Sequence, residues 1–254
     1  MKQIPNIFTL LNLVFGCIAI VFILQTGESI VYLEGNGFSS VVLPEKIALG
    51  ALFIFAAGVV DFLDGFLARL MKAGSEMGKQ LDSLSDVVSF GVAPGMILYQ
   101  LLRMSYAQEA GGLDISIIWL LPAFLVTAAA AWRLARFNLD PAQQYGFKGL
   151  PAPAAGITIA SIPLIIHYNI LDLQAIFINS YLVYAVIVVL SFLMVSRLPM
   201  MALKFTSFSP AANWPKYLLV IIGIAAAVFV KWLAVPVVLV VYILLSLLFK
   251  NKAS

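Results

Sequence analysis

The chain has 254 residues, of which 63% are hydrophobic and 11% charged, a composition that excludes an ordinary soluble globular domain. A net charge of +3, without a basic run interleaved with aromatic residues, argues against nucleic acid as a partner. The single cysteine, Cys17, excludes an intrachain disulfide and a cysteine-based metal site.

Eight apolar runs predict an all-α fold, a polytopic transmembrane helix bundle in which a single domain fills residues 1–254. Because roughly 20 apolar residues cross a bilayer, this length leaves no room for a large soluble domain. We expect spans near residues 4–25, 47–71, 80–102, 114–136, 152–169, 175–196, 214–231 and 233–249.

Basic residues gather in alternate loops of this assignment. The positive-inside rule then predicts that these loops and both termini face the cytoplasm, in the cell membrane. The cations on this side are Lys2, Arg69, Lys72, Lys79, Arg133, Arg136, Lys148, Arg197, Lys204, Lys216, Lys250 and Lys252.

Four aspartates within 26 positions interrupt the apolar pattern, at Asp61, Asp64, Asp82 and Asp86. An ionised aspartate near the bilayer centre costs about 2.5–3.5 kcal/mol, so four of them require something that binds them. The first pair is three positions apart and the second pair four, which places each pair on one face of its helix. Two such faces can meet, and carboxylate oxygens suit Mg²⁺, Mn²⁺ or Ca²⁺ rather than zinc.

Small residues accompany the aspartates on both faces. Gly65, Ala68 and Arg69 follow the first pair on its helix. Gly78 precedes the second pair, and Ser89 follows it. The missing side-chain bulk leaves space for a planar base or a pyrophosphate to approach the backbone. Close packing between membrane helices explains the glycines alone equally well.

Polar residues in other spans are further candidates. Asn12 lies deep in the first span, and we expect it to face the active-site cavity. Asn6 and Thr9 lie on roughly the same side, where capping or a bond to the backbone would also explain them. Arg133 and Arg136, one helical turn apart, could reach a carboxylate or phosphate or serve only the membrane topology.

The order of these residues resembles the signature of the CDP-alcohol phosphotransferases: Asp61-Phe-Leu-Asp64-Gly65-Phe-Leu-Ala68-Arg69, eight residues, Gly78, three residues, Asp82, three residues and Asp86. Every fixed position of that signature, which spans residues 61–86, is filled.

The resemblance implies a metal-dependent transferase. Two Mg²⁺ or Mn²⁺ ions would lie among Asp61, Asp64 and Asp82 with Asp86 near them, and would hold the pyrophosphate of a CDP-linked lipid. Asp86 would also be the general base that deprotonates the attacking hydroxyl, after which CMP leaves.

The resemblance also implies which residues bind the CDP-lipid. It implies that Gly65, Ala68 and Gly78 flank the cytidine and that Arg69 contacts phosphate. We assign Asn12 to the same CDP-lipid site. The resemblance further implies that the protein is a homodimer surrounded by membrane lipid.

Three later segments, residues 89–94, 133–138 and 147–153, are similar to the phosphatidylserine synthase branch, whose acceptor is L-serine. The glycerol-phosphate branch typically has Pro-Leu-Ala-Asp-Lys around its last aspartate, where this chain has Ser-Leu-Ser-Asp-Val at residues 83–87. We therefore expect CDP-diacylglycerol and L-serine to be the substrates. The acceptor would be bound by Ser89, Arg133, Arg136 and Asn138.

Two alternatives remain open at this point. The same enzyme could use another acceptor, such as glycerol phosphate or inositol phosphate. A divalent-cation transporter would explain the four aspartates but not Arg69 beside them, since a fixed cation opposes the passage of cations. The single histidine, His167, excludes the unrelated serine-lipid synthases that need paired histidine motifs.

Overall fold

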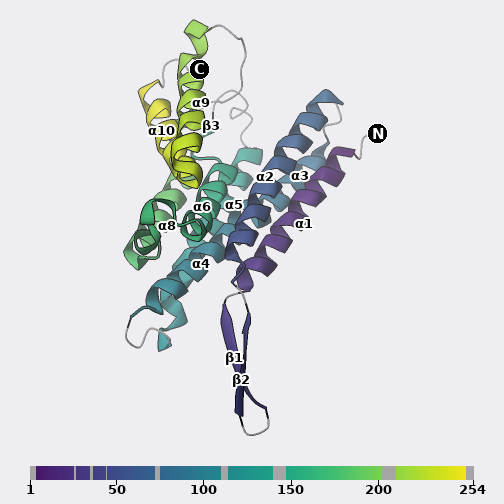
Figure 1. Ribbon diagram of the computed structural model, residues 1–254. Helices are drawn as coiled ribbons and strands as arrows, with labels where there is room; N and C mark the ends of the chain where they lie inside the picture. Colours follow the sequence, from purple (N-terminus) through teal and green to yellow (C-terminus); the bar gives the residue numbers. More distant parts are fainter. Residues whose placement is uncertain are drawn as a thin grey trace.

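The computed structural model describes residues 4–25, 27–34, 37–43, 45–71, 75–109, 114–139, 147–201 and 210–249. Eight helical rods make up most of this part of the chain, as the hydropathy pattern predicts (Figure 1). They are α1 (Ile4–Leu24), α2 (Ile47–Leu70), α3 (Glu76–Val87) continued by α4 (Ala93–Tyr106), α5 (Leu125–Leu139), α6 (Ala152–His167), α8 (Ser180–Val195), α9 (Pro210–Val230) and α10 (Ala234–Leu248).

The helices have the length and composition of membrane spans. Five helical segments of the described chain are long and apolar enough to cross a bilayer, and α6 and α8 are shorter apolar helices. One of the five, residues 213–248, contains α9 and α10 joined by the single 3-10 turn Lys231–Leu233, and these two helices pack against each other as a tight hairpin. The chain is a multi-pass membrane protein.

The charged helix ends lie together. Arg69 at the end of α2 and Lys79 at the start of α3 border one cavity, and Lys79 donates a hydrogen bond to the carbonyl of Asn138 at the end of α5. The strands β1 and β2 lie at the opposite end of the bundle (Figure 1). The alternation predicted from the loops is thus present, while the cytoplasmic orientation stays a prediction. Five of the predicted cytoplasmic cations lie outside the described residues: Lys2, Lys72, Lys204, Lys250 and Lys252.

The helices confirm the all-α class, and two short strand pairs that the sequence analysis did not predict accompany them. Strands β1 (Glu28–Glu34) and β2 (Gly37–Leu43) form an antiparallel hairpin, and β3 (Phe147–Lys148) pairs antiparallel with β4 (Pro199–Met200). The first pair is rich in β-branched residues, which favour strands, and the second joins segments that are far apart in sequence. Neither is long enough to alter the hydropathy pattern from which the helices are predicted.

A π turn, Val88–Val92, links α3 to α4 without breaking the rod. Pro94 is the second residue of α4, and it has no backbone N–H to donate the bond that a regular helix would send to the carbonyl of Phe90. The wider turn accommodates this loss. Phe90 is fully buried there and belongs to the main apolar core.

Helix α6 packs closely on the π turn at Gly156. A Cβ atom on Gly156 would lie 2.9 Å from Cα and 3.0 Å from the carbonyl oxygen of Phe90. Since these are backbone atoms, they cannot move aside as the tip of a flexible side chain would. The absence of a side chain at Gly156 therefore allows α6 to approach closely the rod that carries Asp82 and Asp86.

We expect Gly156→Ala to lower the Tm of the purified protein in detergent by several degrees, because overpacking a tight contact costs about 1–3 kcal/mol. Gly223→Ala in α9 is the matched control, since the nearest atom to its added Cβ, Val238 Cγ2, is 3.5 Å away. Equal Tm values for both variants and the unmodified protein would contradict the close contact.

Candidate functional site

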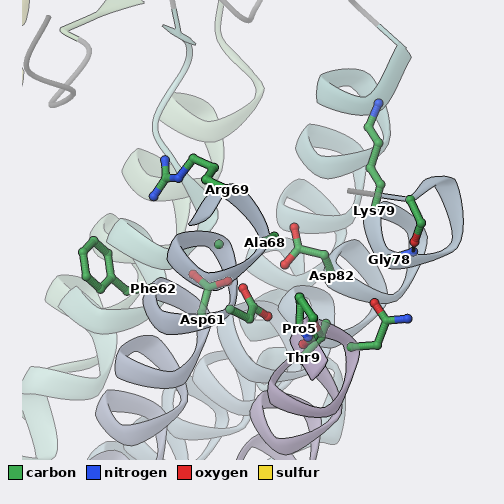
Figure 2. Close-up of a pocket in the computed structure, with 13 residues that line it drawn as sticks. Pro5, Thr9, Asp61, Phe62, Ala68, Arg69, Gly78, Lys79 and Asp82 are labelled. Atoms are coloured by element: carbon green, nitrogen blue, oxygen red, sulfur yellow. Dashed lines mark hydrogen bonds between the residues drawn. The ribbon is translucent and has the colours of Figure 1, made fainter. Parts of the chain in front are cut away.

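Three carboxylates converge between α2 and α3. Asp61 and Asp64 come from α2 and Asp82 from α3, and each offers an oxygen that lies within 4.8 Å of the other two. Figure 2 shows the carboxylates of Asp61 and Asp82 turned toward the same space. The helical spacing predicted from the sequence thus brings both acidic faces together.

This group has the character of a site for a hard divalent cation. Asp64 is only 5% exposed, and its Oδ2 has no hydrogen-bond partner among the described residues. Buried carboxylates this close repel one another unless a cation neutralises them. Oxygen donors without histidine or cysteine fit Mg²⁺ or Mn²⁺, and Asp61, Asp64 and Asp82 are the residues that would hold such an ion.

Asp86 lies one helical turn beyond Asp82 and is buried, with 6% of its surface exposed. Its Oδ1 accepts a hydrogen bond of 3.3 Å from Asn12 Nδ2, and its carboxyl group is within hydrogen-bonding reach of Asp61. Asp86 lies beside the three-carboxylate group and is not a member of it, and its place near the metal ions stays a prediction. Its position beside that group leaves it free for a separate role.

Asn12 orients Asp86 and is itself incompletely bonded. The side chain is fully buried in α1, and its Oδ1 finds no partner in the described part of the chain. The sequence analysis assigned Asn12 to the CDP-lipid site, but Asn12 is not among the residues that border the cavity beside the three carboxylates. Its contact is with Asp86 instead.

A cavity of about 570 Å³ opens beside the three carboxylates (Figure 2). Gly65, Ala68, Arg69 and Gly78, all predicted from the signature, border it. A Cβ atom on Gly65 would meet no described atom within 4 Å, so that this position adds open space to the cavity. The predicted small residues therefore lie where a ligand beside the carboxylates would need room.

Helix α1 supplies a wall of the cavity through residues that the sequence analysis considered but did not assign to the site. Pro5, Asn6 and Thr9 border the cavity, and Thr9 Oγ1 donates to the carbonyl of Pro5, which confirms the backbone bond considered for it. The spacing of Asn6 and Thr9 was the available signal. Phe62, Ser75 and Lys79 also border the cavity.

The beginning of α3 faces the same cavity. Ser75 caps the helix by accepting a hydrogen bond of 3.0 Å from the backbone N–H of Gly78. A Cβ atom on Gly78 would lie 2.9 Å from Asn6 Oδ1, so that a larger residue here would require the Asn6 side chain to move. The positive end of the helix dipole, together with Arg69 and Lys79, favours an anionic ligand such as a pyrophosphate.

Two of the four predicted acceptor residues are engaged with other parts of the fold. Arg136 donates to the carbonyls of Val195 (2.9 Å) and Ser196 (3.5 Å) at the end of α8. Asn138 Nδ2 donates to Ser83 Oγ over 2.7 Å. These contacts tie the end of α5 to α8 and α3, and no sequence pattern indicates such long-range partners.

Ser89 and Arg133 lie closer to the carboxylates. Ser89 is fully buried and its Oγ donates to the carbonyl of Asn12 over 3.0 Å, which joins the π turn to α1. Arg133 is 8% exposed and within electrostatic range of Asp86, and its Nε has no hydrogen-bond partner among the described residues. Of the four, Arg133 alone combines nearness to Asp86 with a donor that has no partner in the described chain.

Comparisons with known proteins agree with the signature. Residues 2–193 match the family model described as CDP-alcohol phosphatidyltransferase. The CDP-diacylglycerol–serine O-phosphatidyltransferase of Bacillus subtilis is 31% identical over 159 residues, which are 63% of this chain and 74% of that protein. The protein of the same name from Mycobacterium bovis is 29% identical over 252 residues, covering 95% and 76%. The archaetidylserine synthase of Methanothermobacter thermautotrophicus is 36% identical over 149 residues, covering 56% and 58%.

Saturating Mn²⁺ or Mg²⁺ should raise the Tm of the detergent-solubilised protein, and Asp64→Asn should abolish that rise. An ion at 100 times its Kd stabilises the folded state by about 2.7 kcal/mol, and the amide keeps the shape of the side chain but removes its charge. Asp172→Asn, at an exposed acid outside the cavity, is the control and should keep the full rise. An unchanged rise in Asp64→Asn would exclude this metal centre.

Proposed function

The chain belongs to the CDP-alcohol phosphatidyltransferase family, and we propose that it makes phosphatidylserine and CMP from CDP-diacylglycerol and L-serine. The observation that carries the proposal is the buried Asp86, which lies beside the three-carboxylate group and within electrostatic range of Arg133. Support for serine comes from the names of the relatives in Bacillus subtilis and Mycobacterium bovis.

Binding of the CDP-lipid uses the cavity beside the carboxylates. Asp61, Asp64 and Asp82 would hold two divalent cations, which when bound neutralise charge on the pyrophosphate and on the departing CMP. Arg69 and Lys79 offer cationic groups to the phosphates at the mouth of the same cavity. The open space at Gly65 accommodates the cytidine.

Asp86 is the general base in this proposal. It takes the proton of the serine hydroxyl as the serine oxygen bonds to the lipid phosphorus, while the bond from that phosphorus to CMP breaks. The hydrogen bond from Asn12 holds the accepting carboxylate in place. Because Asp86 is not one of the three carboxylates that would hold the cations, its carboxylate can serve the acceptor.

Arg133 binds the serine carboxylate in this proposal. A guanidinium group forms paired hydrogen bonds with a carboxylate, and the Nε of Arg133 has no partner in the described chain. Its place near Asp86 would bring the serine hydroxyl toward the base. Ser89, Arg136 and Asn138 then support the site through the bonds described above rather than by contact with serine.

The cavity faces the cytoplasm in this proposal, because it lies at the end of the bundle where Arg69, Lys79 and Arg136 are found. The homodimer implied by the resemblance remains a prediction.

Asp86→Asn should lower CMP release from CDP-diacylglycerol and serine by about 10²–10⁴, the usual contribution of general acid–base catalysis. The amide accepts no proton but can still pair with Asn12. The metal-dependent rise in Tm should persist, because the three-carboxylate group is intact. Full activity in this variant would remove Asp86 from the mechanism.

The acceptor is tested by incubating the purified protein with radiolabelled CDP-diacylglycerol, Mn²⁺ and one alcohol at a time. We expect lipid product with L-serine and none with glycerol 3-phosphate or inositol phosphate, because Arg133 offers a carboxylate site near the base. Asp86→Asn serves as the inactive control. Product with another alcohol, and none with serine, would refute the proposed acceptor.

A further inference from the structure

Two hydrogen bonds determine how α5 lies along α3 and the π turn. Near the end of α5, Asn138 Nδ2 donates to Ser83 Oγ over 2.7 Å. Near its beginning, Thr127 Oγ1 donates to the carbonyl of Gly91 in the π turn over 2.9 Å. The later residue of α5 therefore meets the earlier residue of the rod, so that the two run antiparallel in a register that is fixed at both ends of their contact.

Arg133 and Asp86 lie between these two bonds. Asp86 follows Ser83 by three residues, and Arg133 precedes Asn138 by five residues. At a rise of about 1.5 Å per residue, they are about 4.5 Å and 7.5 Å along their helices from the bond between Asn138 and Ser83. The register therefore places the two residues within about one helical turn of the same level, and both are buried.

The guanidinium of Arg133 has an aromatic neighbour on its own helix. Phe137, which is half-buried, follows Arg133 by four residues, one turn further along α5. Side chains on a helix lean toward its N-terminus, so the ring of Phe137 leans toward the turn that contains Arg133. Cζ of Arg133 lies over this ring, 5.8 Å from its centroid. This distance is within the range of about 6 Å over which an aromatic face attracts a cation.

The contact holds the cation without using its hydrogen-bond donors. An aromatic face offers negative charge but no oxygen acceptor. Accordingly, Arg133 Nε has no hydrogen-bond partner among the described residues, although the side chain is only 8% exposed. A buried N–H without a partner costs free energy, which a ligand with an acceptor would recover. A carboxylate fits best, because it accepts paired hydrogen bonds from a guanidinium.

We propose that Phe137 is a positioning residue, whose ring holds the Arg133 guanidinium near the level of Asp86 with its Nε–H directed to the carboxylate of the acceptor. The site then selects an acceptor that has a carboxylate and a hydroxyl group close together, as a hydroxy amino acid has. This inference rests on the proposed function, in which Arg133 binds the acceptor and Asp86 takes its proton.

Phe137→Leu removes the aromatic face and keeps an apolar side chain. We expect the KM for serine to rise about tenfold, because a cation–π contact away from water contributes a free energy of this order. The KM for CDP-diacylglycerol should stay within twofold, since Phe137 does not border the cavity beside the three carboxylates. The measurement is CMP release in mixed micelles, with each substrate varied at a saturating level of the other. An unchanged KM for serine would overturn the proposal.

Two further variants separate the aromatic face from general packing. Phe137→Tyr keeps the face, and its KM for serine should stay within about threefold of the unmodified protein. Trp132→Leu is the matched control for losing a ring from α5, because Trp132 is 64% exposed on the residue before Arg133. Its KM for serine should not change. An equal rise in Phe137→Tyr or in Trp132→Leu would overturn the proposal, and the Tm values show that each variant folds.

Arg133→Gln distinguishes this inference from the proposed function. A large rise in the KM for serine with Arg133→Gln, but none with Phe137→Leu, would leave the proposed acceptor site intact and overturn the role of Phe137. An unchanged KM with Arg133→Gln would overturn both. If the unmodified protein releases CMP only with another alcohol, the proposed acceptor has failed. The same comparison of Phe137→Leu with Phe137→Tyr, made with the KM for that alcohol, then tests Phe137 separately.

Discussion

The repulsion between aspartates that lie close together among apolar helices is the interaction on which the arrangement of α1, α2 and α3 depends. Two unit charges about 4 Å apart repel by about 4 kcal/mol at an effective dielectric constant of about 20. The oxygens of Asp61, Asp64 and Asp82 lie within 4.8 Å of one another, with Asp86 close behind. These carboxylates can all stay ionised only if a cation neutralises them, which is the arrangement expected of the metal site in a CDP-alcohol phosphatidyltransferase.

The surrounding helices hold these charges in place through close backbone contacts. A Cβ atom at Gly16 would lie 2.5 Å from Ser89 Oγ, and one at Gly156 would lie 2.9 Å from Cα of Phe90. The π turn is thus fixed from α1 on one side and from α6 on the other. Catalytic groups must be positioned to within about 0.5 Å, which rigid elements achieve better than loops.

The helical rods and the acidic centre could be predicted from local sequence, because hydropathy and helical spacing are properties of single segments. Gly65, Ala68, Arg69 and Gly78 all border the cavity as expected. Partners between distant segments could not be predicted in this way. Arg136 was assigned to the acceptor, but in the structure it binds carbonyls at the end of α8, since the sequence does not indicate which helix ends meet. The pairing of β3 with β4 was missed for the same reason, because these strands are far apart in the sequence.

The contacts of Met201 with α10 have a consequence for biogenesis, since its N–H donates to Ser246 Oγ and its carbonyl accepts from the Tyr242 hydroxyl. Spans enter the membrane in the order of their synthesis, and the two side chains that bind Met201 belong to the last of them. The strand pair β3–β4 can form earlier. Met201, which follows β4, lacks its partners until the final helix has been translated. A nascent chain would therefore contain all four aspartates of the acidic centre well before the segment after β4 gains its partners in α10.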